Sequence, residues 1–278
     1  MPRSAPSSHV NLMVPANPML RCALAPQTDT HSIEAPCASC NLRELCIPWG
    51  LTKEELDRIE SVLSQRRQVK KGSLLFRNGD KFTSLFTIRT GFFKSAVFTE
   101  DGSEQVTGFQ MAGEVLGFDG IANGHHTCDA IALEDAQLCQ MPFEGIVELA
   151  SNIPSLQFRL HQIMSREIVR ESGIRLLAFV GAEKRLAAFL LDLADRLHAL
   201  GYSPTELVLR MTREDIGSYL GLKHETVSRA FSKLSEQGLV AVDNRNIPRT
   251  YKSPQSLSLR ALFFARNGKG RKSTIKPA

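Results

Sequence analysis

The stretch MTREDIGSYLGLKHETVSRAFSKLSEQGLVAV, residues 211–242, decides the fold of the C-terminal part of the chain. Thr212 can cap a first helix whose buried face includes Ile216 and Leu220. Gly221 then permits a sharp turn into a second helix. This order of helix, short glycine turn and helix predicts a helix-turn-helix, which lays its second helix in the major groove of DNA.

The second helix is expected from about His224 to Gln237. Val227, Phe231 and Leu234 recur at helical spacing and form its inward face. A glycine at position 238 ends the helix, and the following LVAV predicts a strand that starts a wing. The segment therefore predicts a winged helix-turn-helix.

Four side chains on the exposed N-terminal face of the second helix are candidate DNA contacts: His224, Glu225, Ser228 and Arg229. Glu225 can accept a hydrogen bond from cytosine, and Arg229 can donate two to guanine, whereas Ser228 suits a base or a phosphate. Thr212 is counted with these DNA-binding residues. The alternative, an ordinary charged face of a bundle helix, leaves the turn and the wing unexplained.

Positive charge gathers at the C-terminal end of the chain. The whole chain has a net charge of +5, but residues 244–278 contain nine Lys and Arg and no acidic residue. The rest of the chain has 25 basic and 29 acidic residues. The end of the chain is therefore a candidate contact for phosphates, with a solvated basic tail as the alternative.

The middle of the chain changes pattern twice. Residues 51–63 predict a short amphipathic helix, capped by Thr52 with Glu55 three residues later. Between residues 68 and 142, short apolar runs separated by glycines, with a hairpin signal at Asp101-Gly102, predict an antiparallel sandwich, roll or barrel. Helical spacing returns after Phe143 to about residue 178, and again from about 183 to a stop at 201.

Three cysteines, Cys37, Cys40 and Cys46, lie within ten residues of one another. A short loop with these spacings can aim three thiolates at one point. A fourth sulfur from elsewhere would complete the set that an iron–sulfur cluster or a structural zinc requires.

The first 30 residues predict disorder and have no apolar core of a secretory signal, and no apolar run is long enough to span a membrane. The protein is therefore expected in the reducing cytoplasm, where cysteines serve as ligands or buried thiols.

Residues 151–180 predict a helix that pairs with a second copy of the chain. A stripe with steps of three and four residues runs through His161, Met164, Ile168, Glu171, Arg175 and Ala178. Glu171 occupies an inward position of this stripe, so two copies would bring two carboxylates together at a cost in desolvation and repulsion. Arg175 could partly neutralise Glu171, and Ile168 could shield it. Packing within one chain is the alternative for this helix.

With these segments, the chain resembles the oxygen-responsive FNR branch of the cyclic-AMP-receptor superfamily of bacterial regulators. The resemblance runs from about residue 37 to 262, through CASCNLRELCIP, GSEQVTGFQMAGEVLGFDGI, LCQMP and TREDIGSYLGLKHETVSR. It implies an α+β fold with an antiparallel β-roll, a long dimerisation helix and a C-terminal winged helix-turn-helix. The implied segments are a tail (1–30), a cysteine loop (31–50), the roll (51–150), the dimerisation helix (151–180), the DNA-binding domain (181–262) and a basic tail (263–278).

The resemblance also implies a cofactor and its ligands. One four-iron, four-sulfur cluster per subunit would be held by Cys37, Cys40, Cys46 and, because LCQMP matches the family's context, Cys139. Cys128 would be a buried thiol of the roll. The family carries a carboxylate at the position of Glu171, where it is taken to keep the cluster-free protein monomeric.

The partners implied are double-stranded DNA with a TTGA…TCAA inverted repeat, a second copy of the chain when the cluster is bound, and RNA polymerase. The base-reading residues of the family fall on Glu225, Ser228 and Arg229. The polymerase contact falls on the hairpin tip formed by Glu100, Asp101, Gly102 and Ser103.

Three other functions are alternatives for this chain. Zinc at the cysteines would give a static site without a redox response. Cyclic-nucleotide binding is disfavoured because VLGFDGIANGHHTCDAIA, after Gly113-Glu114, has no cation to hold a phosphate. An enzyme is disfavoured because the chain has no phosphate loop, nucleophile motif or dinucleotide fingerprint.

Overall fold

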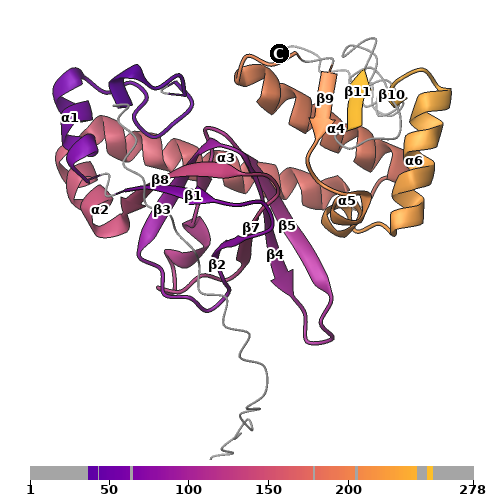
Figure 1. Cartoon of the computed structure of the whole chain (residues 1–278), viewed down its shortest axis with the longest axis horizontal. Helices are drawn as coiled ribbons and strands as arrows, with labels where there is room; N and C mark the ends of the chain where they lie inside the picture. The colour runs from indigo at the N-terminus through magenta and orange to yellow at the C-terminus, as the bar shows by residue number, and fades with distance from the viewer. Residues whose placement is uncertain are drawn as a thin grey trace, which may run out of the picture.

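The β-roll forms because short alternating strands pair into two antiparallel sheets. The computed structural model describes residues 37–42, 44–62, 65–177, 179–203, 206–242 and 249–252. One sheet has the order β1-β8-β3-β6 and the other β2-β7-β4-β5. The strands are β1 (Gln65–Val69), β2 (Leu74–Phe76), β3 (Ser84–Thr90), β4 (Phe92–Phe98), β5 (Glu104–Met111), β6 (Val115–Leu116), β7 (Asp129–Ala132) and β8 (Ala136–Pro142). The predicted antiparallel roll is confirmed (Figure 1).

Helices close the cysteine side of the roll. The cysteine loop begins with a single turn, η1 (Cys37–Ser39), and leads to α1 (Lys53–Val62). The predicted cap of α1 is present, because Thr52 N donates to the Glu55 carboxylate at 2.8 Å and Glu55 N donates to Thr52 Oγ1 at 3.3 Å. A second turn, η2 (Phe118–Gly120), precedes β7.

The helical segment after the roll is divided in two, which the periodicity did not predict. It forms α2 (Phe143–Asn152) and α3 (Pro154–Leu177). The break lies at Ile153, whose φ of −129° and ψ of 91° are extended. The residue before a proline is forced out of the helical region, so Pro154 sets this boundary. Helix α3 then runs along the roll toward the DNA-binding domain (Figure 1).

The C-terminal domain has the predicted winged helix-turn-helix. It contains α4 (Ala182–Ala199), β9 (Glu206–Leu209), α5 (Arg213–Leu220), α6 (His224–Glu236), β10 (Ala241–Val242) and β11 (Arg249–Lys252), with the sheet order β10-β11-β9. The α5–α6 corner needs two glycines. Gly221 is left-handed, with φ 63°, and a Cβ on Gly217 would lie 2.6 Å from the Leu222 carbonyl oxygen.

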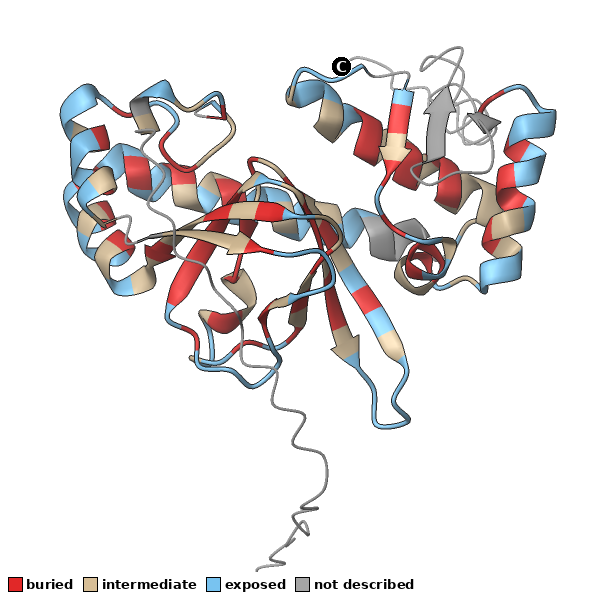
Figure 2. Cartoon of the chain, in the orientation of Figure 1, coloured by how far each residue is buried: buried red, intermediate tan, exposed pale blue. Residues whose placement is uncertain are grey.

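Three apolar clusters hold these parts together. One fills the roll around Phe93 and Leu138, and a second joins the cysteine loop to α1, α2 and α3 through Ile47 and Leu156. The third joins Phe109 of β5 to α4, α5 and α6, so it spans the roll and the DNA-binding domain. Figure 2 shows these buried residues along the facing sides of the elements. The expected tails (1–30 and 263–278) and Cys22 lie outside the described residues.

Candidate cofactor site and nucleic-acid interface

The cysteine loop is folded by its own backbone hydrogen bonds. Cys40 N donates to Cys37 O at 3.2 Å, and Cys46 N donates to the carbonyl of Leu42 at 2.9 Å. Cys37 N donates to the carboxylate of Glu60 on α1, which anchors the start of the loop. These bonds give the three loop cysteines a fixed arrangement.

The fourth cysteine of the motif lies on the sheet beside this loop. Cys139 is on β8, opposite Arg66 of β1 and Thr87 of β3. Directly opposed residues in antiparallel strands share one face of the sheet. Arg66 and Thr87 therefore flank Cys139 on its own face.

The thiols of the loop and the sheet interact electrostatically as one group. Burial, together with the negative charges of Cys139, Glu60 and Cys40, raises the pKa of Cys37 to about 12. Burial also raises the pKa of Cys46 to about 12, with further contributions from Cys139 and Cys37. Such mutual influence requires proximity. The structure thus brings together the four cysteines that the motif singled out.

A buried hydroxyl indicates that this site suits thiolates. Thr87 is 2% exposed, and its Oγ1 has no hydrogen-bond partner among the described residues. Thr87 opposes the rise in the pKa of Cys46, so its hydroxyl lies near that thiol. Burial raises the pKa of Cys139 too, whereas the charges of Arg66 and Arg89 lower it. Donors that are satisfied by anionic sulfur fit a metal centre with four thiolate ligands.

Within the part of the chain that the structure describes, no three His, Cys, Asp or Glu side chains converge on a position for one metal ion. The choice between a cluster and a single zinc therefore rests on the cysteine motif and not on the geometry of these side chains.

Cys128 and its neighbours belong to the core of the roll. Cys128 is buried in the roll cluster, and burial raises its pKa to about 12, with the charge of Asp119 as the next cause. His126 is 4% exposed, stacks on Phe76 with ring centroids 3.6 Å apart, and pairs with Asp119. These contacts account for both residues as packing groups, and Cys128 is buried as expected.

Helix α3 has one face in the protein and another in solvent. Leu156 is fully buried and Ile163 nearly so. Ile168 is 63% exposed, and Met164 and Glu171 are also exposed. The side chain of Arg175 lies outside what the structure describes. An apolar side chain such as Ile168, left in solvent on a helix whose other face is packed, is suited to a partner.

The four candidate DNA contacts predicted on the second helix lie at the start of α6. His224, Glu225 and Arg229 are exposed, and Ser228 is partly exposed. Ser228 Oγ accepts a hydrogen bond from Arg213 Nη1 at 2.9 Å, and the Arg213 guanidinium lies over the Phe231 ring. Sequence reasoning missed Arg213, whose contact with Ser228 depends on how α5 crosses α6.

Thr212 has a different role from the other candidate DNA contacts. Its hydroxyl accepts from Asp215 N at 3.0 Å and donates to the Asp215 carboxylate at 2.7 Å, in a reciprocal cap of α5. Thr212 therefore orients the first helix, and its hydroxyl is already engaged within the protein.

Helix α5 is fastened to the β4–β5 hairpin. Lys94 Nζ donates to the Asp215 carboxylate at 2.7 Å and also pairs with Glu104. Ser218 Oγ accepts from Val106 N at 2.8 Å and donates to the Glu104 carbonyl at 2.9 Å. These bonds join the DNA-binding domain to the roll at a strand edge.

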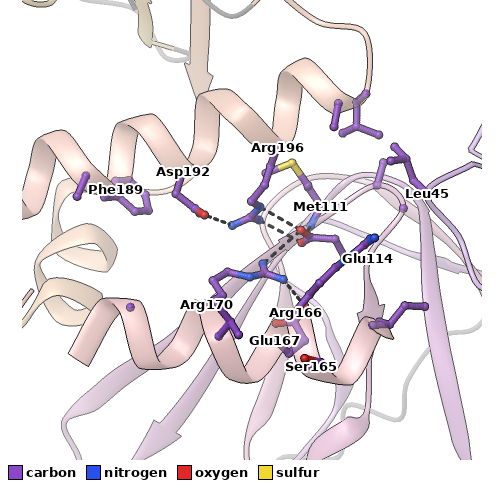
Figure 3. Close-up of a pocket in the computed structure, with 18 of the residues that line it drawn as sticks. Leu45, Met111, Glu114, Ser165, Arg166, Glu167, Arg170, Phe189, Asp192 and Arg196 are labelled. Atoms are coloured by element: carbon purple, nitrogen blue, oxygen red, sulfur yellow. Dashed lines mark hydrogen bonds and ion pairs between the residues drawn. The ribbon is translucent and has the colours of Figure 1, made fainter. Parts of the chain in front are cut away.

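A carboxylate in the roll joins α3 to α4. Glu114 Oε1 accepts from Arg170 Nη1 at 3.2 Å, and Glu114 Oε2 accepts from Arg196 Nη2 at 3.1 Å. Arg196 Nε also forms an ion pair with Glu114 Oε1, with the two atoms 3.0 Å apart. Figure 3 shows both guanidinium groups pointing at Glu114 from the two helices. Asp192 and Glu167 complete the network. Sequence reasoning missed this junction, because its members are far apart in the chain.

The cavity beside β5 is lined by no positively charged side chain of the described residues. It has a volume of about 460 Å³, and the residues that line it include Asp119, Glu167 and Glu171 but no Lys or Arg. A phosphate there would face carboxylates and no cation.

The tip of the β4–β5 hairpin is exposed at all four of its residues, Glu100, Asp101, Gly102 and Ser103. The Asp101 carboxylate accepts from Ser103 N at 3.2 Å and from its hydroxyl at 2.9 Å, which shapes the tip.

Comparisons with known proteins agree with this architecture. Residues 66–152 match the model of the cyclic nucleotide-binding domain, and residues 184–257 match the Crp-like helix-turn-helix domain. The structure of FixK2 from Bradyrhizobium japonicum is similar, with a TM-score of 0.64 and 26% identity over 71% of this chain and 96% of that one. The global regulator CLP from Xanthomonas campestris shares the fold, with a TM-score of 0.59 and 20% identity over 73% of this chain and 100% of that one.

Two relatives have a common name. The fumarate and nitrate reduction regulatory proteins of Escherichia coli (strain K12) and Salmonella typhimurium (strain LT2) are each 42% identical to this chain. Each match covers 76% of this chain and 85% of the relative. No helix in the described ranges is both long and apolar enough to cross a bilayer. With its matched domains and its exposed recognition helix, the chain belongs to the FNR family of transcription regulators, which bind DNA through a helix-turn-helix and are not enzymes.

Proposed function

We propose that this regulator senses oxygen through a four-iron, four-sulfur cluster and, with the cluster bound, dimerises on DNA to activate or repress genes. The observation that carries the proposal is the four-cysteine motif in a chain of the FNR family, with Cys37, Cys40 and Cys46 in one hydrogen-bonded loop and Cys139 on β8 of the roll. Four thiols from two parts of the fold offer the complete ligand set of such a cluster.

Cys37, Cys40, Cys46 and Cys139 would hold one cluster per subunit, which supplies an oxygen-labile connection between the loop and the roll. Thr87 and Arg66 favour the thiolate forms on which that connection depends. The alternative, zinc at the cysteines or a factor that works without a cluster, would leave DNA binding insensitive to air.

Helix α3 supplies the dimer face in this proposal. Ile168 is exposed and would pack across a two-fold axis. Glu171, one turn later, would lie opposite Glu171 of the second subunit, and two carboxylates in a partly desolvated helix–helix interface repel each other. Arg175 follows at the next turn and is proposed to soften this repulsion. The dimer interface would be stable only while the ordered cysteine loop fixes the position of α3.

Paired subunits would present two recognition helices to a TTGA…TCAA inverted repeat, about one DNA turn apart. Glu225 and Arg229 would read base edges, and His224 and Ser228 would support them. Thr212 contributes through the orientation of α5. The tip from Glu100 to Ser103 is proposed to contact RNA polymerase in the cytoplasm, because it is exposed at the end of the hairpin.

No cyclic nucleotide is needed for this switch. Among the residues that the structure describes, none that lines the cavity in the roll is cationic, and Glu114 is already engaged by Arg170 and Arg196. Binding of an anionic phosphate would be opposed by the carboxylates of the cavity.

DNA affinity with and without oxygen tests the proposal. A labelled duplex with the inverted repeat is titrated with anaerobically purified protein, and the titration is repeated after exposure to air. The proposal expects tight binding that is lost in air. Persistent binding in air by protein that contains zinc would establish the static alternative.

A further inference from the structure

Arg159 is the one arginine among the buried polar and charged residues of the described chain. It lies in the second turn of α3 and is 3% exposed. Burial lowers its pKa, and the charge of Arg166 adds to this effect. A buried guanidinium is costly unless its donors are satisfied. Its partners therefore decide where this part of α3 can lie.

Those partners are carbonyl groups of the cysteine loop. Arg159 Nε donates to Cys46 O at 3.2 Å, and Nη2 donates to Leu45 O at 2.9 Å, to Cys46 O at 3.2 Å and to Glu44 O at 3.4 Å. The guanidinium also lies 5.0 Å from the centre of the Trp49 ring. The hydrogen bonds exist only while residues 44–46 keep this fold.

The same part of α3 packs on the loop through apolar contacts. Leu156 and Ile163 belong to the apolar cluster that also contains Ile47 and Leu51, with Cys46 packed against it. Arg159 lies between the two apolar positions of α3, so its charge sits inside a packed interface. Displacement of the loop would leave a buried cation without those carbonyls.

The geometry of the helix carries this constraint to the exposed face. Arg159 and Ile168 are nine residues apart, so they point in directions about 180° apart and lie about 14 Å apart along the axis. Arg159 faces the loop while Ile168 faces solvent. A helix held by Arg159 on one side thus has its opposite side fixed for a partner.

We propose that Arg159 is a positioning residue that couples the fold of the cysteine loop to helix α3, and through α3 to the dimer face. The inference rests on the proposed function for its physiological meaning, since a bound cluster would add to the stability of the loop fold that Arg159 contacts. Loss of the loop fold releases Arg159 from three carbonyls, and α3 then loses its fixed position. The negative charge of cluster-bound Cys46 would attract the Arg159 guanidinium and strengthen its contact with the loop.

The test compares Arg159→Gln with Arg166→Gln in the full-length protein. Arg166 carries the same charge two turns along the same helix but is exposed, so it is the matched control. Hydrogen exchange of residues 40–51 and of α3 is measured in metal-free protein. The dimer dissociation constant is measured by sedimentation velocity, before and after anaerobic loading with iron and sulfide.

The proposal expects Arg159→Gln to speed exchange in the loop and in the first turns of α3 together, by about tenfold or more. At equal iron content, the variant should also lose most of the change in dimer dissociation constant that loading produces in the wild type. Arg166→Gln should resemble the wild type in both measurements. Wild-type exchange in both segments of Arg159→Gln would overturn the proposal.

Two further outcomes separate this inference from the proposed function. If the wild type takes up no cluster, the oxygen-sensing proposal fails, but the exchange comparison in metal-free protein still decides the role of Arg159. If Arg159→Gln does not fold, Arg159→Lys keeps the charge but cannot span three carbonyls. The hydrogen-exchange rate of the loop in Arg159→Lys should lie between that of the wild type and that of a loop without these hydrogen bonds. A wild-type exchange rate in Arg159→Lys would contradict the proposed role of Arg159.

Discussion

Lys94 of β4 and Asp215 of α5 are 2.7 Å apart and join the roll to the first helix of the DNA-binding domain. Their side chains are 12% and 11% exposed. Desolvation opposes ionisation of Asp215, but hydrogen bonds from Lys94 and Thr212 outweigh it and lower the pKa of Asp215. The pair thus stays charged at neutral pH within an interface that positions the recognition helix.

Replacing Lys94 should destabilise the protein strongly. Lys94→Met leaves Asp215 and Glu104 without their cation, and removal of one partner of a buried pair costs about 3 kcal/mol. The free energy of unfolding from urea titration measures this loss. The control is Lys70→Met, whose pair with Asp135 is exposed and should change stability by less than about 1 kcal/mol. Equal effects of the two substitutions would refute a structural role for the interdomain pair.

The pH dependence of stability should reveal Glu167. Burial raises the pKa of Glu167 from 4.5 to about 7, against the opposing charge of Arg170. The folded state then holds a proton that the unfolded state has released, so Glu167 costs stability as pH rises from about 4.5 to about 7. Glu167→Gln should gain stability relative to the wild type over this window. A constant difference between the two proteins from pH 5 to 8 would show that Glu167 does not titrate there.

The fourth ligand can be identified by two matched cysteine substitutions. Cys139→Ser should abolish cluster uptake, because Cys139 is the proposed fourth ligand. Its charge contributes to the raised pKa values of Cys37 and Cys46, as expected of a neighbouring thiol. Cys128→Ser should retain the cluster, since Cys128 is buried in the roll core and bonded to Asp119. Visible absorption and the iron content of anaerobically loaded proteins measure both. The reverse result would reassign the ligand.

The carboxylate on the exposed face of α3 should keep the cluster-free protein monomeric. Glu171→Ala removes the proposed repulsion, so this variant should dimerise and bind the inverted repeat in air. Sedimentation velocity under aerobic conditions measures the change, with Glu148→Ala on α2 as a control outside the stripe. A monomeric Glu171→Ala protein would show that the dimer interface is governed by other groups.

Base reading should depend on Arg229 and not on Thr212 directly. Arg229→Ala removes a side chain that is exposed on α6 and should weaken binding to the inverted repeat by about 1–3 kcal/mol, with relaxed preference at one base pair. Thr212→Ala removes a helix cap and should lower stability by about 1 kcal/mol without relaxing base preference. Anisotropy titrations with base-pair variants of the site distinguish the two. Relaxed preference in Thr212→Ala would instead indicate a direct base contact.

Local signals in the sequence were enough for the elements of the DNA-binding domain. Gly221 and the Thr212 cap act over a few residues, so α5 and α6 could be placed correctly. The break before Pro154 was missed, because helical periodicity continues across it. The proline itself is the signal that could have revealed the break, since it restricts the residue before it.

Contacts between distant segments could not be predicted in the same way. Arg159 meets carbonyls more than a hundred residues earlier in the chain, and Glu114 meets arginines from two helices. Backbone carbonyls are present at every residue, so a sequence gives no sign of which ones a buried arginine will meet. The cysteines were identifiable because their residue type is rare and their spacing is restricted.

The proposed cluster at four cysteines of this chain is tested most directly by the metal and sulfide content of protein purified without oxygen. About four iron atoms and four sulfides per chain are expected, with visible absorption that bleaches in air. The Cys46→Ser variant should contain neither iron nor sulfide. About one zinc per chain, without sulfide and unchanged by air, would contradict a cluster at these cysteines.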